Sequence, residues 1–182
     1  MSRGIRAVAV LAVEFDVYLL DKATKMHYNK KKGAEKMIFP ATEAIQETLR
    51  THNMRCGVEE REGTSVVHVG ITTAVTEFEV LFISHSEDND VAMRIYNLIR
   101  FPAEKLASAT ETINSFNYRY RFLKFSVDTD HNTVDVEYDL PVSEEQVGEA
   151  AFEILMRSAH ILDLCYPELM QLLSDGNKEE MS

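Results

Sequence analysis

Little in this sequence indicates a fold that needs covalent or metal cross-links. The 182 residues include only two cysteines, Cys56 and Cys165, which lie far apart and form no C-x-x-C pair. This usage argues against a disulfide framework and suits a reducing cytoplasm. With 7 glycines and 4 prolines, collagen-like and low-complexity classes are excluded. No apolar run approaches the roughly 18 residues of a membrane-spanning helix. We therefore expect a soluble, cytoplasmic protein that is long enough to bury one core.

Basic residues are scarce outside the N-terminal segment. The chain carries 19 Lys and Arg against 30 Asp and Glu, a net charge of −11. Residues 1–38 hold eight basic and four acidic residues, so the excess of negative charge is carried entirely by residues 39–182. An acidic body repels phosphate backbones, and we expect no binding to nucleic acid or membrane. The acidity either attracts a basic protein partner or only solvates the surface.

Residues 1–37 are predicted to be a basic extension in front of the main domain. The segment Ile5–Leu20 is strand-like, because its apolar run is short and no signal-peptide cleavage site follows it. The consecutive lysines at 30–32 indicate a solvated linker. Met26 and Met37 could each be an internal start, so the extension is either a strand plus linker or a start-site artefact.

Residues 38–175 show alternating helix and strand signals and are predicted to form one α+β domain, followed by an acidic tail at 176–182. Thr42 is a candidate N-cap for a first helix that ends near residue 52. Further helices are expected from Pro102 to about 118 and from a capping box at Ser143 to about 165, with a continuation from Pro167. Strand signals cover residues 56–60, 65–73, 77–85, 121–128 and 133–140, and a β-rich run spans 91–101. The order α-β-β-β-α-β-β-α predicts a twisted antiparallel sheet flanked by helices on one face.

The last helix is apolar over more than one stripe of its circumference. Such a helix must be covered on several sides, by its own sheet and by a second subunit. We therefore predict a homodimer whose interface draws on Phe152, Leu155, Met156, Ala159 and Leu162.

The segment 133–140 alternates apolar and acidic residues without a break, which is typical of a half-buried antiparallel strand. Its acidic side is the candidate partner-binding surface, formed by Asp135, Glu137 and Asp139. Charge reversal at Glu137 should change thermal stability by less than about 0.5 kcal/mol, as exposed substitutions usually do. An apolar alternative is the face bearing Phe78, Val80 and Phe82, although such a face is more simply core.

Catalytic signatures are missing from the sequence. The six histidines lack metal-ligand spacing, and no phosphate-binding glycine loop or nucleophile elbow is present. The motif Asp128-x-Asp130-x-Asn132 imitates a calcium loop, but Thr133 stands where that loop needs glycine, so a polar hairpin turn is the better interpretation. We expect no catalytic residues, no metal and no cofactor. A remote alternative is an enzyme that uses clustered carboxylates.

Three short motifs resemble the YbjN family in their order and spacing. They are Ile113-Asn114-Ser115-Phe116-Asn117, Arg121 to Asp128 (RFLKFSVD) and Val134 to Pro141 (VDVEYDLP), followed by Tyr166-Pro167-Glu168-Leu169 near the end of the last helix. The resemblance covers about residues 38–174. It implies a fold similar to type III secretion chaperones, commonly dimeric, in a family of bacterial sensory transduction regulators without a demonstrated catalytic site. It also implies that Asn114 and Asn117 tie a helix end to the next strand.

These observations favour a non-enzymatic protein-binding module, chaperone-like or regulatory, that acts as a homodimer. The alternative is a dedicated secretion chaperone for an exported protein. In both cases the partner is another protein, which the sequence does not name.

Overall fold

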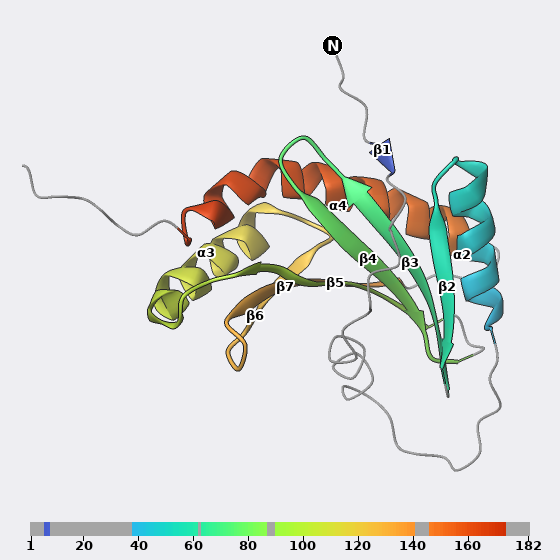
Figure 1. The fold of residues 1–182 in the computed structure, drawn as a ribbon, viewed down its shortest axis with the longest axis horizontal. Helices are drawn as coiled ribbons and strands as arrows, with labels where there is room; N and C mark the ends of the chain where they lie inside the picture. Colours follow the sequence, from blue (N-terminus) through green and yellow to red (C-terminus); the bar gives the residue numbers. More distant parts are fainter. Residues whose placement is uncertain (1–5, 8–37, 62, 87–89, 141–145, 174–182) are drawn as a thin grey trace, which may run out of the picture.

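An antiparallel sheet of seven described strands, with helices on one side, forms the fold in the computed structural model (Figure 1). The structure describes residues 6–7, 38–61, 63–86, 90–140 and 146–173. Most of the predicted N-terminal extension, the capping box at Ser143 and the acidic tail lie outside these residues. In chain order the elements are β1 (Arg6–Ala7), α2 (Pro40–Thr51), β2 (Cys56–Arg61), β3 (Thr64–Thr72), β4 (Glu77–Ser84), β5 (Val91–Arg100), a 3₁₀ turn (Ala103–Lys105), α3 (Leu106–Arg119), β6 (Lys124–Asp128), β7 (Thr133–Leu140) and α4 (Val147–Met170).

All strand pairings are antiparallel, and the order across the sheet is β3-β4-β5-β7-β6, with β1 and β2 both on the outer edge of β3. The predicted α+β class with an antiparallel sheet and flanking helices is therefore confirmed. The β-rich run at 91–101 forms β5, in the middle of the sheet. Between Ile95 and Ile99 the pairing of β5 with β7 shifts register. Asn97 adopts a positive φ of 52° there, which asparagine tolerates better than most residues.

The three helices cover one face of the sheet and bury the main core. The helix α4 crosses the sheet from α2 at one end to α3 at the other (Figure 1). Apolar residues of the strands alternate toward these helices, and the largest fully buried side chains of this core include Phe82, Phe116, Phe125, Leu155 and Leu162. No helix in the described part of the chain is long and apolar enough to cross a membrane.

The start of α2 differs from the sequence expectation. The helix begins at Pro40, and Phe39 rather than Thr42 is the N-cap residue. Proline fits the first helical position because its missing N–H would have no partner there. Thr42 is consequently inside the helix on its buried side. Its hydroxyl hydrogen-bonds with the Ser65 and Ser84 hydroxyls, at 2.6 and 3.0 Å, which joins α2 to β3 and β4.

The helix α4 also differs from the expectation, because it is one unbroken helix from Val147 to Met170. Pro167 lies inside it rather than at the start of a separate segment, so only the one hydrogen bond that its missing N–H would have donated is lost. Near its other end, Gly148 packs tightly against α2, where an added Cβ would lie 2.9 Å from the Ala44 carbonyl oxygen. Close helix–helix contact at this point requires glycine.

Candidate functional site

The acidic strand β7 was the predicted partner-binding surface, and the structure pairs its carboxylates within the sheet. Asp135 is only 4% exposed, and its Oδ1 accepts a hydrogen bond from the Asn97 backbone N–H at 2.9 Å. Because this carboxylate is buried and already accepts a backbone hydrogen bond at the register shift of β5, a partner protein cannot contact it. The assignment of Asp135 to a recognition surface is therefore corrected.

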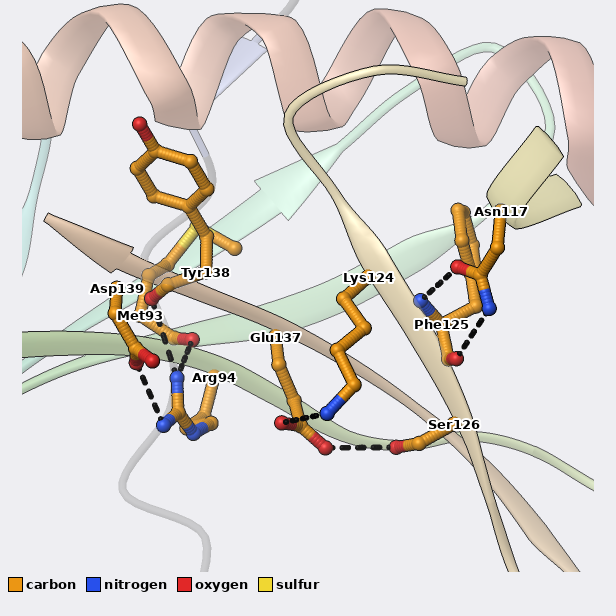
Figure 2. Close-up of polar contacts among 9 residues, drawn as sticks. All are labelled: Met93, Arg94, Asn117, Lys124, Phe125, Ser126, Glu137, Tyr138 and Asp139. Atoms are coloured by element: carbon orange, nitrogen blue, oxygen red, sulfur yellow. Dashed lines mark hydrogen bonds and ion pairs between the residues drawn. The ribbon is translucent and has the colours of Figure 1, made fainter. Parts of the chain in front are cut away.

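Glu137 and Asp139 face the same side and are also engaged (Figure 2). The Ser126 hydroxyl donates to Glu137 Oε1 at 2.8 Å, and Lys124 Nζ lies 3.4 Å from Oε2. Arg94 Nη2 lies 2.8 Å from Asp139 Oδ1, while its Nη1 donates to the Tyr138 carbonyl. Because each carboxylate has a cation beside it, little unbalanced charge is left to attract a basic partner.

The predicted dimer-interface residues on α4 separate into two groups. Leu155, Ala159 and Leu162 are fully buried in the core of this one chain. Their assignment to an interface is corrected, because they face the sheet and have no surface to offer. Phe152 and Met156 are only partly buried and line a shallow groove on the outer side of α4.

This α4 groove is formed by Gln146, Glu149, Ala150, Phe152, Glu153, Met156, Arg157 and His160. The apolar part of the groove is held in place by a contact with the end of α2. The Phe152 ring stacks on the His52 ring with a centroid distance of 3.7 Å and an interplanar angle of 6°. The charges of the groove are divided along the helix. Glu149 and Glu153 lie in the first half, whereas Arg157 and His160 lie in the second. The two halves meet where Arg157 Nε donates to Glu153 Oε1 at 3.0 Å, and Glu149 Oε2 lies 3.7 Å from His52 Nε2 of α2.

An aromatic residue that the sequence reasoning missed lies beside the α4 groove. Phe122, in the loop between α3 and β6, is 51% exposed and adopts a φ of 74°. That conformation costs a bulky residue free energy and persists only where the surroundings hold it. The Arg157 guanidinium lies 4.6 Å from the centroid of its ring. No local pattern around residue 122 could have indicated a left-handed backbone, so this feature required the tertiary structure.

The other predicted features are parts of the core or of turns. Val80 and Phe82 are fully buried and Phe78 packs on them, which confirms the core interpretation of that face. Asp128 uses its Oδ1 to accept the backbone N–H groups of Asp130 and His131, as a polar hairpin turn requires. Within the described ranges, no three His, Cys, Asp or Glu side chains are placed to share a metal ion.

The two thiols are poor nucleophiles. Burial raises the pKa of the Cys165 thiol to about 12, and burial also raises the pKa of Cys56, partly offset by the charge of Arg50. Thiolate is the reactive form of cysteine. At neutral pH both residues are therefore held as unreactive thiols.

The structural role implied for Asn117 is confirmed. Its side-chain amide donates from Nδ2 to the Phe125 carbonyl at 3.0 Å and accepts the Phe125 N–H at Oδ1, at 2.8 Å (Figure 2). These two bonds join the end of α3 to the edge strand β6. Asn114 is exposed and makes no comparable bond to the part of the chain that the structure describes.

The fold and these surfaces define a class of protein: an α+β domain with an open antiparallel sheet, helices on one face and paired carboxylates on the other. A family model described as "Putative bacterial sensory transduction regulator" matches residues 41–169. The chain therefore belongs to this family, YbjN. Comparisons with curated proteins and with solved structures found no match.

Proposed function

We propose that this protein is a non-enzymatic binding module, chaperone-like or regulatory, and that it forms a homodimer through the α4 groove. The observation that carries the proposal is the division of charge along that groove. A two-fold symmetric interface uses the same patch on both subunits, so the patch must complement itself. An antiparallel second copy would bring Glu149 and Glu153 against Arg157 and His160, so that the ion pair between Glu153 and Arg157 of each chain would gain an opposite charge from the other chain on each side.

The apolar residues of the α4 groove also support a second copy of this chain as the partner. Met156 is near the middle of the lining residues, where a two-fold axis would place it against its own copy. Phe122 supplies an exposed, rigid aromatic ring at the border, and such rings are frequent anchors at interfaces. The strain of its backbone is explained if the ring position is needed for contact.

Sedimentation velocity of the full chain at micromolar concentration tests the proposal. Met156→Lys should weaken the dimer by at least about tenfold, because it places two cations together at the axis. The matched control is Tyr118→Lys, since Tyr118 is 93% exposed on α3, and it should leave the dimer unchanged. Phe122→Gly is a second variant that relieves the positive φ and should weaken association without loss of the fold. A monomeric wild-type chain, or equal effects of the Met156 and Tyr118 variants, would refute the proposal.

A further inference from the structure

A pocket of about 230 Å³ lies between the end of β7, the helix α4 and the loop that joins α3 to β6. Its inner part belongs to the main core, because Leu140 and Ile154 line it and are each only 4% exposed. Phe122 and Tyr138 supply two aromatic walls. Protein interiors leave few voids larger than a water molecule, so a pocket of this size that reaches core residues is larger than ordinary packing leaves.

The size of this β7–α4 pocket limits what it can hold. Pockets for drug-sized ligands measure roughly 300–1,000 Å³, whereas an apolar cavity of about 150 Å³ is enough for benzene. The β7–α4 pocket lies between these two cases. It therefore fits one aromatic ring that carries a small substituent, and larger cofactors exceed it.

The charges in the lining of the pocket neutralise each other. Among the described residues that line it, only Glu153 and Arg157 are ionised at neutral pH. The Arg157 Nε donates to Glu153 Oε1 at 3.0 Å, and its guanidinium lies 4.6 Å from the centroid of the Phe122 ring. A charged ligand would find no unpaired opposite charge here and would lose its own hydration, which is costly. The lining therefore favours an uncharged molecule.

One polar group in the wall remains available to such a molecule. Figure 2 shows the Tyr138 ring pointing from β7 toward α4, with the hydroxyl at its far end. The backbone carbonyl of Tyr138 accepts a hydrogen bond from Arg94, but its hydroxyl makes none in the described part of the chain. A phenolic hydroxyl can both donate and accept, and a tyrosine that is partly buried usually has a partner for it. A ligand with one donor or acceptor would supply that partner.

We propose that the β7–α4 pocket binds a small, uncharged aromatic molecule with one hydrogen-bonding substituent, of about the size of phenol. Its ring packs against Phe122, Leu140 and Ile154, and its substituent bonds to the Tyr138 hydroxyl. This site goes beyond the proposed homodimer and does not require it. Glu153 and Arg157 line the α4 groove as well as the pocket, so the bound molecule also lies beside residues of that groove.

A titration of the methyl-labelled full chain with phenol, followed by NMR, tests the location of the site. Phenol should cause saturable shifts of the Leu140 and Ile154 methyl signals. Leu81 is the internal control, because it belongs to an apolar cluster separate from the main core, and its signals should not move. Shifts at Met156 without shifts at Leu140 and Ile154 would place phenol in the α4 groove and would overturn the proposal. A dissociation constant weaker than about 10 mM would also overturn it.

Tyr138→Phe tests the hydrogen bond, with phenol and toluene as paired probes. The variant keeps the ring and removes the hydroxyl, so it should bind phenol about fivefold more weakly, which is the usual effect of one neutral hydrogen bond. Toluene has no polar group, and its affinity should stay within about twofold. The matched control is Tyr118→Phe, the same substitution at a position that is 93% exposed, and it should change neither affinity. Equal losses for both probes, or no loss for phenol, would overturn the proposal.

Ala150→Phe tests the pocket itself, because the new ring would fill the space that Ala150 lines. Phenol should then no longer shift the Leu140 and Ile154 signals, and persistent shifts would overturn the proposal. If this variant fails to fold, the titrations of wild type and Tyr138→Phe still decide. None of these outcomes depends on whether the chain sediments as a monomer or a dimer, so failure of the ligand site can be told apart from failure of the homodimer.

Discussion

The paired hydrogen bonds of Asn117 allow the sharpest quantitative test of this fold. The strand β6 is at the edge of the sheet and pairs only with β7 among the described strands. The backbone N–H and carbonyl of Phe125 point away from β7, and the Asn117 amide satisfies both. The side chain thus replaces two bonds that a further strand would have made, and it protects an edge that could otherwise pair with another chain.

The cost of removing this amide can be worked out. A hydrogen bond contributes about 1 kcal/mol net, and less where water can replace the lost partner. Asn117 is exposed, so Asn117→Ala should lose about 1–2 kcal/mol from the two bonds. Alanine is a better helix former than asparagine by about 0.5 kcal/mol, which offsets part of the loss. We therefore expect a net destabilisation near 1 kcal/mol.

Asn114→Ala is the matched control, because it makes the same substitution in α3 and removes no such bond. It should gain the helix propensity alone, so the two variants should differ by the contribution of the two bonds, about 1–2 kcal/mol. Urea unfolding measures this difference as a shift of midpoint at constant slope. If the two variants differ by less than about 0.5 kcal/mol, the amide does not hold β6 and the reasoning is refuted.

Three further predictions concern a glycine, a thiol and a carboxylate. Gly148→Ala should lower the free energy of unfolding in urea by about 1–3 kcal/mol, because the added Cβ would crowd a backbone carbonyl of α2. Gly57→Ala is the control, because its Cβ would have open space around it, and it should cause no loss of stability. Burial raises the thiol pKa of Cys165 from 9.0 to about 12, so the stability that the protonated thiol contributes is complete below pH 9 and is lost as pH rises toward 12. Cys165→Ala should therefore make the free energy of unfolding depend less on pH in that window, and an unchanged slope would contradict this prediction. Glu137→Lys should cost about 1–2 kcal/mol in thermal unfolding, above the roughly 0.5 kcal/mol expected of an exposed substitution, because lysine cannot accept the Ser126 hydroxyl and adds a second cation beside Lys124. Glu137→Gln should cost less, because its amide oxygen can still accept that bond.

The elements that the sequence predicted well are those with strong local periodicity. The strict alternation of Val134, Val136 and their acidic neighbours identified β7, and the spacing of Ile45 and Leu49 identified the buried side of α2. The start of α2 was predicted three residues late, with Thr42 instead of Phe39 as the N-cap, because Thr42 has a good capping side chain. Its hydroxyl instead bonds to Ser65 and Ser84, which are distant in sequence, and no local rule could weigh that competition.

The candidate interface on α4 shows that sequence periodicity alone does not tell which side of a helix each apolar residue faces. A wide apolar arc correctly indicated that this helix is covered on several sides, but periodicity cannot assign each residue to a side. Leu155, Ala159 and Leu162 proved to face the sheet, and only Phe152 and Met156 keep surface. Which arc faces inward depends on how α4 crosses the strands, and its contacts at both ends are with residues distant in sequence. Gly148 packs against α2, and Arg119 of α3 contacts Glu168.

Net charge alone misled the choice of a recognition surface. A value of −11 suggested an acidic strand that attracts a basic partner, yet two cations lie beside that strand, with Arg94 at Asp139 and Lys124 at Glu137. Pairing on neighbouring strands cancels the local field, whatever the total charge. Recognition is therefore better sought where charges of both signs border apolar surface that the fold leaves open, and in the described part of the chain the α4 groove is such a place.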